Sequence, residues 1–259
     1  MSEINTRELI KLPSKGLLYP ENHPFHNKEE IEIKLLTASS EDLLTSKSLI
    51  KSGNLLNILT KEVLIDKTVD INSLLVGDRD AIIIYTRLFS FGTDYKAVAN
   101  CKYCGTNGEY TFDLSNVPIK YLEHNPIKEG ENLFAFTNSA NTVRIQFRLM
   151  TVQISDDIKK DLEGKEKFNK KHGNFNSIEN NVTTLYRHII KSINENEDPK
   201  YINEYINNMP MKESIEFKKY IKEINPTIEF KSDFYCMNCG EQNLEVALDF
   251  NANFFWTDF

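Results

Sequence analysis

The sequence CKYCG at residues 101–105 and the sequence CMNCG at residues 236–240 decide the fold that we expect. Each is a C-x-x-C pair followed by glycine, with strand-like sequence on both sides, and we call each a knuckle. Glycine after the second cysteine permits the tight turn that brings backbone amides near the sulfurs. The two knuckles hold all the cysteines of the chain: Cys101, Cys104, Cys236 and Cys239.

These four cysteines match the ligand set of a structural zinc site. A tetrahedral Zn²⁺ ion needs four ligands, and four thiolates leave no position for a catalytic water. We therefore predict one structural Zn²⁺ per chain. Free buried thiols and an iron–sulfur cluster stay open as alternatives. Two matched pairs do not fit a thioredoxin-like redox motif, which has one pair, and a chain of this size does not need disulfides.

The knuckles lie far apart in the sequence, so a shared ion would join the middle of the chain to its end. Closing the loop of residues 105–235 costs roughly 4 kcal/mol of chain entropy on a logarithmic estimate. Zinc binding at structural sites contributes about 10–16 kcal/mol, which exceeds that cost. We expect an α+β protein, a mixed helical domain with a split four-cysteine zinc ribbon and an inserted helical subdomain.

Composition narrows the function classes. The 259 residues carry 31 Lys and Arg against 38 Asp and Glu, a net charge of -7. General nucleic-acid binders usually present a basic surface, so this balance argues against one, although zinc ribbons often bind nucleic acid. No apolar run approaches the length of a membrane span. The start Met-Ser-Glu-Ile does not resemble a signal peptide, so we expect synthesis inside the cell, where thiols stay reduced.

We expect four segments in chain order. Residues 1–30 form an extended N-terminal arm, and residues 31–154 form an α+β region with the first knuckle. Residues 155–225 form a helical insert. Residues 226–259 hold the second knuckle and an aromatic C-terminal tail, together with six acids and only one lysine.

Both ends of the chain are unusually apolar. The sequence LPSKGLLYP at residues 12–20 interleaves large apolar residues with two prolines and a glycine, which exclude a regular helix. The sequence NFFWTDF at residues 253–259 places four aromatic residues in the last six positions, whereas termini are normally polar and frayed. Each end either packs on the chain's own core or anchors an interface with a neighbour.

The sequence GDRD at residues 77–80 opens a helix. Residues 82–91 are apolar nearly all round, so we predict a central, buried helix that ends at Gly92. Asp78 is expected to be its N-cap. The three charged residues of this sequence could form a catalytic or ion site, but a cap with a local salt bridge is the simpler explanation, because acids favour helix N-termini.

Periodicity predicts the remaining elements. Alternating apolar residues predict strands beside each knuckle and a β-hairpin around the polar turn at residues 138–141. Helix-start residues at 37–42 predict a helix that runs to about Lys51, and a second helix is predicted over residues 55–64. From Ser155 the pattern is helical to about Ile224.

Catalytic patterns are missing. The five histidines fall mostly in polar loops without a suitably spaced serine, cysteine or carboxylate, and HExxH, GxSxG and complete P-loop sequences are absent. We therefore expect no enzyme activity. An enzyme that uses the helical insert as a lid stays a rival, which a deep pocket lined by convergent polar groups would support.

The order of these features follows a known pattern. The LPSKGLLYP lead-in, the segment LLTASSED at residues 35–42, the GDRD helix and CxxCG are followed by a helical insert, a second CxxCG and a short aromatic tail. This order resembles the T4-type tailed-phage baseplate family over nearly the whole chain. Members are baseplate hub subunits or hub-assembly proteins, so the resemblance implies a structural role in building the contractile tail.

The resemblance also implies partners and a location. It implies contacts with other phage baseplate hub proteins, without nucleic acid or membrane, in the virion tail baseplate after assembly in the host cytoplasm. Retention in the virion and self-association within the baseplate stay open. We expect zinc to fix the ribbon while the N-terminal arm and the C-terminal aromatic residues bind neighbours. The alternative is a zinc-ribbon module that binds nucleic acid or the transcription machinery.

Overall fold

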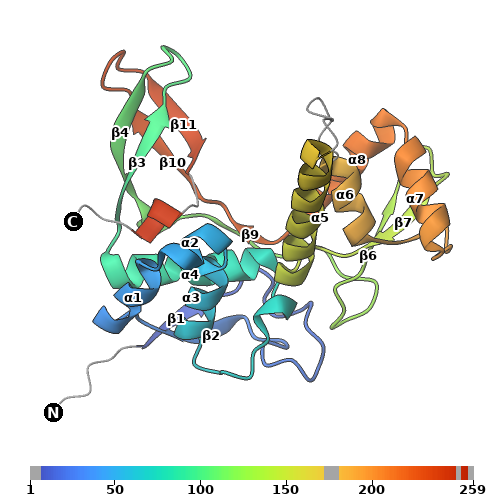
Figure 1. The fold of residues 1–259 in the computed structure, drawn as a ribbon, viewed down its shortest axis with the longest axis horizontal. Coiled ribbons are helices and arrows are strands. Elements are labelled where there is room, and N and C mark those ends of the chain that lie inside the picture. The colour runs from blue at the N-terminus through green and yellow to red at the C-terminus, as the bar shows by residue number, and fades with distance from the viewer. Residues whose placement is uncertain (1–6, 172–180, 249–251, 256–259) are drawn as a thin grey trace.

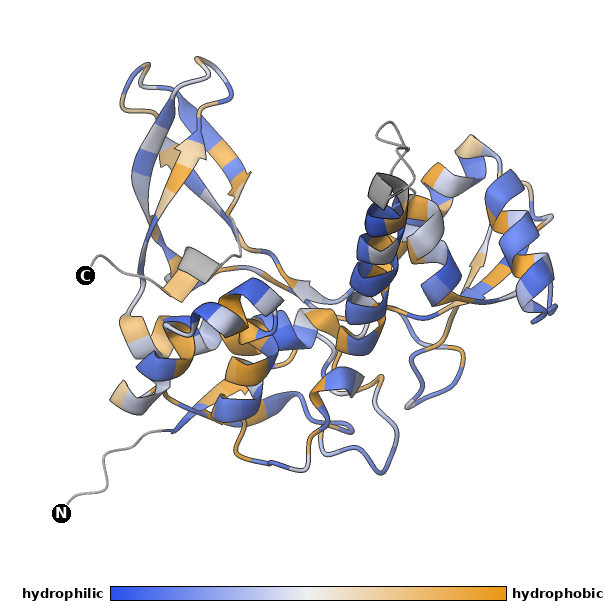
Figure 2. Ribbon diagram, viewed as in Figure 1, coloured by the Kyte–Doolittle hydropathy of each residue, from blue (hydrophilic) through white to orange (hydrophobic). Residues whose placement is uncertain are grey.

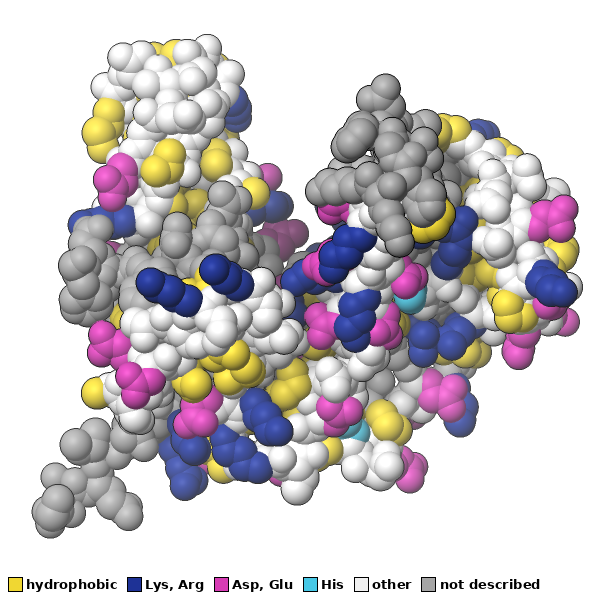
Figure 3. Space-filling view, viewed as in Figure 1, with side chains coloured by type: hydrophobic (Ala, Val, Ile, Leu, Met, Phe, Trp, Pro, Cys, Tyr) yellow, Lys and Arg dark blue, Asp and Glu magenta, His cyan; other side chains and the backbone are white. Residues whose placement is uncertain are grey.

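The computed structural model describes residues 7–171, 181–248 and 252–255. Figure 1 shows a helical base, a ribbon of two β-hairpins at one end of the base, and a lobe of helices with a small sheet at the other end. The chain runs from the base into the first hairpin, on to the lobe, and back to the second hairpin. The ribbon and the lobe stand apart at their outer ends (Figure 3).

Eight α-helices lie in the described part of the chain. They are α1 (Glu41–Leu44), α2 (Lys47–Ser52), α3 (Leu55–Val63), α4 (Val76–Phe91), α5 (Val152–Lys171), α6 (Asn181–Ile189), α7 (Pro199–Asn208) and α8 (Met211–Ile224). Short 3-10 helices are η1 (Ala38–Ser40), η2 (Ile71–Ser73), η3 (Leu114–Asn116) and η4 (Ala252–Phe255). The single helix expected from the start signal at residues 37–42 to about Lys51 is broken, because Ser46 is extended and the Thr45 hydroxyl donates to the backbone carbonyl of Glu41.

The strands are short and every pair is antiparallel. They are β1 (Arg7–Lys11), β2 (Glu30–Lys34), β3 (Asp94–Asn100), β4 (Asn107–Asp113), β5 (Ile119–Lys120), β6 (Phe134–Thr137), β7 (Arg144–Phe147), β8 (Ile190–Ile193), β9 (Thr227–Ile228), β10 (Lys231–Tyr235) and β11 (Gln242–Ala247). They form the pairs β1–β2, β3–β4, β5–β9 and β10–β11 and the sheet β6–β7–β8. The expected α+β class is confirmed.

Helix α4 lies between two hydrophobic cores. Ile82 belongs to the core of the base and the lobe, whereas Ile83 and Ile84 belong to the core that continues into the ribbon. All three are buried, as the apolar pattern predicted. Figure 2 shows the contrast with α5, along which hydrophilic residues (blue) predominate.

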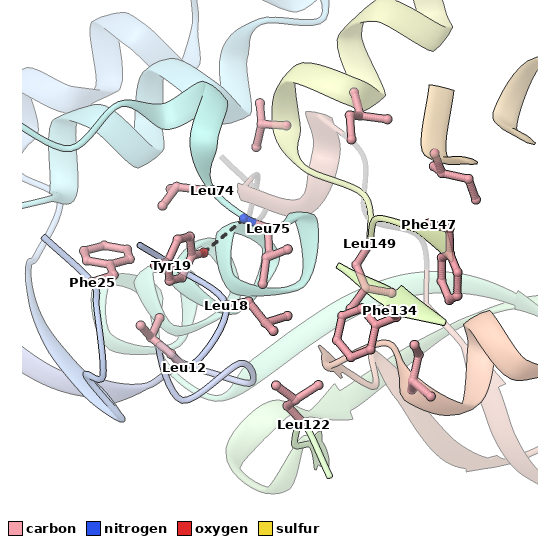
Figure 4. Close-up of a cluster of buried hydrophobic side chains, with 14 of the residues drawn as sticks. Leu12, Leu18, Tyr19, Phe25, Leu74, Leu75, Leu122, Phe134, Phe147 and Leu149 are labelled. Carbon is pink, nitrogen blue, oxygen red and sulfur yellow. Dashed lines mark hydrogen bonds between the residues drawn. The ribbon is translucent and has the colours of Figure 1, made fainter. Parts of the chain in front are cut away.

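The prediction that Asp78 caps α4 is wrong. Leu75 is the N-cap residue, and the buried Asp78 carboxylate accepts hydrogen bonds from Ser14 N (2.9 Å), Ser14 Oγ (2.5 Å) and Tyr19 Oη (2.7 Å). Tyr19 Oη also accepts the Leu75 N–H at 3.0 Å (Figure 4). Burial raises the pKa of Asp78, although the bonds from Ser14 and Tyr19 act to lower it. Together these bonds fasten the N-terminal segment to the start of α4.

The N-terminal segment is therefore part of the base. Within the segment predicted to be an extended arm, strand β1 pairs with β2. Ile10 lies opposite Ile31. Leu12 and Leu18 are buried in the same core as α4 (Figure 4). Of the two alternatives for residues 12–20, the structure shows packing on the chain's own core. Residues 1–6 lie outside the described residues.

Strand β8 corrects the prediction that the segment from Ser155 to about Ile224 is helical without strands. Helix α6 ends at Ile189, and β8 then pairs with β7, with Ile193 opposite Ile145. Both isoleucines are fully buried. A short apolar run fits a helix or a strand equally well, and here the hairpin edge selects the strand. The hairpin of β6 and β7 thus shares a lobe with the helices that follow it.

The described aromatic residues of the C-terminal tail also pack on the chain itself. Phe254 and Phe255 are buried in the core that includes Tyr95 of β3, and Phe254 meets the Tyr95 ring edge-on at 5.3 Å between centroids. The expectation that they bind a neighbour is wrong for these two residues. Residues 256–259, with the remaining aromatic residues, lie outside the described part of the chain.

Arg87 of α4 fixes this arrangement. Its fully buried guanidinium donates to three backbone carbonyls, those of Phe254 (3.2 Å), Gly92 (2.8 Å) and Asp94 (2.7 Å). Burial lowers its pKa. The end of α4, the start of β3 and the C-terminal tail therefore meet at one side chain.

No helix in the described part of the chain combines the length and the apolar character needed to span a bilayer.

Gly77 gives a test of how closely α4 packs. A Cβ at this position would lie 2.0 Å from the Pro226 carbonyl oxygen. We expect Gly77→Ala to lower the free energy of unfolding by about 1–3 kcal/mol through overpacking, although alanine favours helix. The matched control is Gly164→Ala in α5, where the added Cβ meets open space and should stabilise by about 0.5–1 kcal/mol. Urea denaturation measures both, and stabilisation by both variants would contradict the close approach.

Asp78 gives a test of the link to the N-terminal segment. We expect Asp78→Ala to lower the free energy of unfolding by about 2–4 kcal/mol, because it leaves the buried donors of Ser14 and Tyr19 without an acceptor. Asp42→Ala, at an exposed position of α1, should change it by less than about 0.5 kcal/mol. Thermal unfolding compares the two, and equal losses would show that Asp78 does not anchor this segment.

Candidate metal centre

The two knuckles lie at the turns of facing hairpins. One connects β3 to β4 and the other connects β10 to β11. Aromatic residues pack the hairpins together: the rings of Tyr110 and Phe234 lie 4.1 Å apart, and Phe112 meets Phe234 edge-on. This packing carries the two turns to the same end of the ribbon (Figure 1).

All four predicted cysteines come together at that end. Their sulfur atoms lie within 4.8 Å of one another. Cys101 Sγ lies 3.7 Å from Cys239 Sγ, and Cys104 Sγ lies 3.6 Å from Cys236 Sγ. Four sulfurs about 2.3 Å from a tetrahedral zinc ion are about 3.8 Å apart, so the spacing fits one such ion. The geometry can therefore hold one metal ion.

The two knuckles have the same backbone. The amide N–H of Gly105 donates to Cys101 O and that of Gly240 donates to Cys236 O, each at 2.8 Å. These glycines have φ values of +70° and +75°, a conformation that other residues rarely adopt. Nothing lies within 4 Å of the Cβ position at either glycine, so the requirement is conformational and not steric. The first cysteine of each pair (Cys101, Cys236) is buried, and the second (Cys104, Cys239), called the outer cysteine below, is exposed.

Asn243 of β11 supports the first knuckle from the second hairpin, and sequence reasoning missed it. Its fully buried side chain donates to Cys101 Sγ at 3.4 Å and accepts the Lys102 N–H at 3.0 Å. It lies opposite the inward-facing Phe234. A polar residue at an inward strand position beside a knuckle is the signal that could have found it.

The electrostatics of the outer cysteines differ. The hydroxyl and the backbone of Thr106 and the amide of Asn238 bind Cys104 Sγ and lower its pKa to about 5. Asn238 belongs to the second knuckle, so this bond also crosses between the hairpins. The pKa of Cys239 is raised to about 12: a backbone bond at Glu241 acts to lower it, but desolvation and bonds to the other thiols outweigh that effect.

The arrangement of the four cysteines favours metal binding. Metals bind the thiolate, and Cys104 has that form at neutral pH. Desolvation acts to raise the pKa of Cys101, but bonds from backbone amides and Asn243 outweigh it and lower the pKa. Four sulfur ligands fill a tetrahedral shell and leave no position for a substrate or water.

The other sequence candidate does not form a site of this kind. Asp78 binds the N-terminal segment, and Arg79 pairs with Asp80 at 2.7 Å. The local salt bridge of the simpler explanation is confirmed for Arg79 and Asp80. The charged residues of the GDRD sequence thus have structural partners.

Comparisons with known proteins identify a family. A family model described as T4 bacteriophage base plate protein matches residues 7–256. No curated protein and no solved structure matches the chain.

Asn243 gives a test of the support between the hairpins. We expect Asn243→Ala to lower the free energy of unfolding by about 1–3 kcal/mol, because the Lys102 N–H loses its acceptor and the buried Cys101 Sγ loses a donor. Its neighbour Gln242 is exposed, and Gln242→Ala should change stability by less than about 0.5 kcal/mol. Chemical denaturation of both variants checks this, and a neutral Asn243→Ala would contradict the role assigned to the side chain.

Proposed function

The chain belongs to the family of T4 bacteriophage base plate proteins, and from that membership we propose that it is a subunit or an assembly factor of the baseplate hub. The family makes it a structural phage protein of the virion tail baseplate that associates with other baseplate proteins. The hub, its proteins as partners, and a stage in the host cytoplasm before incorporation belong to the proposal. The mechanism is scaffolding through protein–protein contacts and not catalysis.

We further propose that Cys101, Cys104, Cys236 and Cys239 hold one structural Zn²⁺. The observation that supports this most directly is the convergence of four thiols, two from each hairpin, within 4.8 Å. Thiolate ligands in a tetrahedral arrangement favour zinc, and a complete sulfur shell suits a structural ion. The ion fixes the ribbon as a rigid projection from the base.

The buried ends of the chain change where partners can bind. Leu12 and Tyr19 near one end and Phe254 and Phe255 near the other are enclosed in the chain's own cores. These four residues are therefore not available to neighbouring proteins. The ribbon and the helical lobe project from opposite ends of the base and are the surfaces that we propose partners contact (Figure 1).

Phage tails assembled with and without this chain test the proposal. We expect tails made without it to lack a complete hub, and the wild-type chain supplied in trans to restore them. Mass spectrometry of purified tails then separates a retained subunit, present in each baseplate, from an assembly factor, absent from finished tails. Complete, infectious tails formed without the chain would overturn the proposal. A DNA column tests the nucleic-acid alternative, and the net charge of -7 predicts no retention.

A further inference from the structure

A cavity opens on the helical lobe, away from the cysteines. Its volume is about 820 Å³. Helices α5 and α6, strand β8 and the first turn of α7 line it. Figure 3 shows Lys and Arg side chains (dark blue) on this lobe, mixed with Asp and Glu side chains (magenta) around a histidine (cyan).

Three cations converge on the cavity from three different elements. Lys165 comes from α5, Arg187 from α6 and Lys191 from β8. Within the described residues, none of them has a carboxylate within 4.0 Å, the distance of a salt bridge. None of the three cations therefore has a direct ion-pair partner within the described residues, although Asp161 and Glu197 also line the cavity.

Neutral partners hold two of these cations in place. Lys165 Nζ donates to Thr184 Oγ1 at 2.7 Å. Arg187 donates from Nε to Asn203 Oδ1 at 2.6 Å and from Nη2 to Asn207 Oδ1 at 2.7 Å. Positioning a charge with neutral groups orders the side chain without cancelling the charge. Such an arrangement is prepared for an anion, because little side-chain entropy remains to be lost on binding.

A fourth cation, Arg148, does not line the cavity but acts electrostatically on Lys191. Arg148 Nε is shielded from solvent and has no hydrogen-bond partner among the described residues, while its Nη2 lies 3.4 Å from His188 O. Burial and then the charge of Arg148 lower the pKa of Lys191, against the opposing effect of Glu197. A bound anion would relieve this repulsion.

Two acidic residues also line the cavity, Asp161 and Glu197. Asp161 accepts a hydrogen bond from His188 Nε2 at 2.8 Å, so it is paired with the imidazole. Glu197 is exposed. Its carboxylate repels polyanions such as nucleic acid more strongly than it repels a single carboxylate.

The lining also has apolar parts. Ile190 and Ile202 are buried beneath the cavity, and Pro199 lies beside them. This combination suits a segment that offers carboxylates to the cations and aliphatic side chains to the isoleucines. The volume exceeds what a single phosphate ion would fill.

We propose that this cavity binds an acidic segment of a partner protein, through carboxylates that contact Lys165, Arg187 and Lys191. The assignment rests on the proposed function and deepens it, since it names the chemistry of one contact between this chain and a neighbour in the baseplate. It places that contact on the helical lobe, away from the four clustered cysteines.

Fluorescence anisotropy tests the site with the full-length chain. The probe is a fluorescein-labelled peptide of alternating glutamate and leucine, and its control is the same peptide with glutamine in place of glutamate. The double variant Lys165→Glu/Lys191→Glu reverses two exposed cations of the cavity. Lys218→Glu is the charge-matched control, because Lys218 is exposed on α8 and does not line the cavity. Circular dichroism checks that each variant is folded.

We expect the acidic peptide to bind the wild type and Lys218→Glu alike, and to bind the double variant at least tenfold more weakly. Absence of binding, equal binding by the glutamine peptide, or unchanged binding by a folded double variant would overturn the proposal. Displacement of the peptide by millimolar inorganic phosphate at constant ionic strength would reassign the site to phosphate and also overturn it. Incorporation of the wild-type chain into tails is scored separately, so failure here leaves the proposed function to its own test.

Discussion

Four sulfur atoms from two distant parts of the sequence must meet at one end of the ribbon, and the architecture follows from that constraint. The first knuckle follows the base and the second follows the helical lobe, so everything between them is held as an insertion. Aromatic packing of Tyr110 on Phe234 and the cross-hairpin bonds of Asn243 bring the sulfurs to spacings that suit one metal ion. A bound ion would add stabilisation of about 10 kcal/mol or more. It would reinforce a ribbon that side-chain packing has already aligned.

Helix α4 extends this constraint to both ends of the chain. Its first turn binds the N-terminal segment through Asp78, and its last turn binds the C-terminal tail through Arg87. Both groups are buried and hydrogen-bonded, and one partner of each lies far away in the sequence. The base, the ribbon and the described segments near both ends are therefore one connected structure.

Local patterns could predict much of this fold, and long-range contacts could not. The cysteine spacing, the hairpins and the buried α4 were predictable, because each depends on residues close together in the sequence. The cap prediction for Asp78 depended on neighbouring backbone amides as donors, whereas its actual donor Ser14 lies 64 residues earlier. Strand β8 was missed because Ile190 and Ile193 fit helical spacing until β7 is placed beside them. The same limit applies to Asn243 and to the cations of the cavity, whose roles appear only when separate elements meet.

Membership in the baseplate family gives the chain a structural role in a phage tail, and the structure adds a cluster of four cysteines that could hold a metal ion. A ribbon fixed by a metal can present a constant surface through the mechanical changes of a contractile tail. X-ray absorption at the zinc edge, on chain purified without chelators, tests this account most directly. The account predicts one zinc per chain surrounded by four sulfur atoms at about 2.3 Å. A well-folded chain without metal, or zinc bound by nitrogen and oxygen ligands, would contradict it.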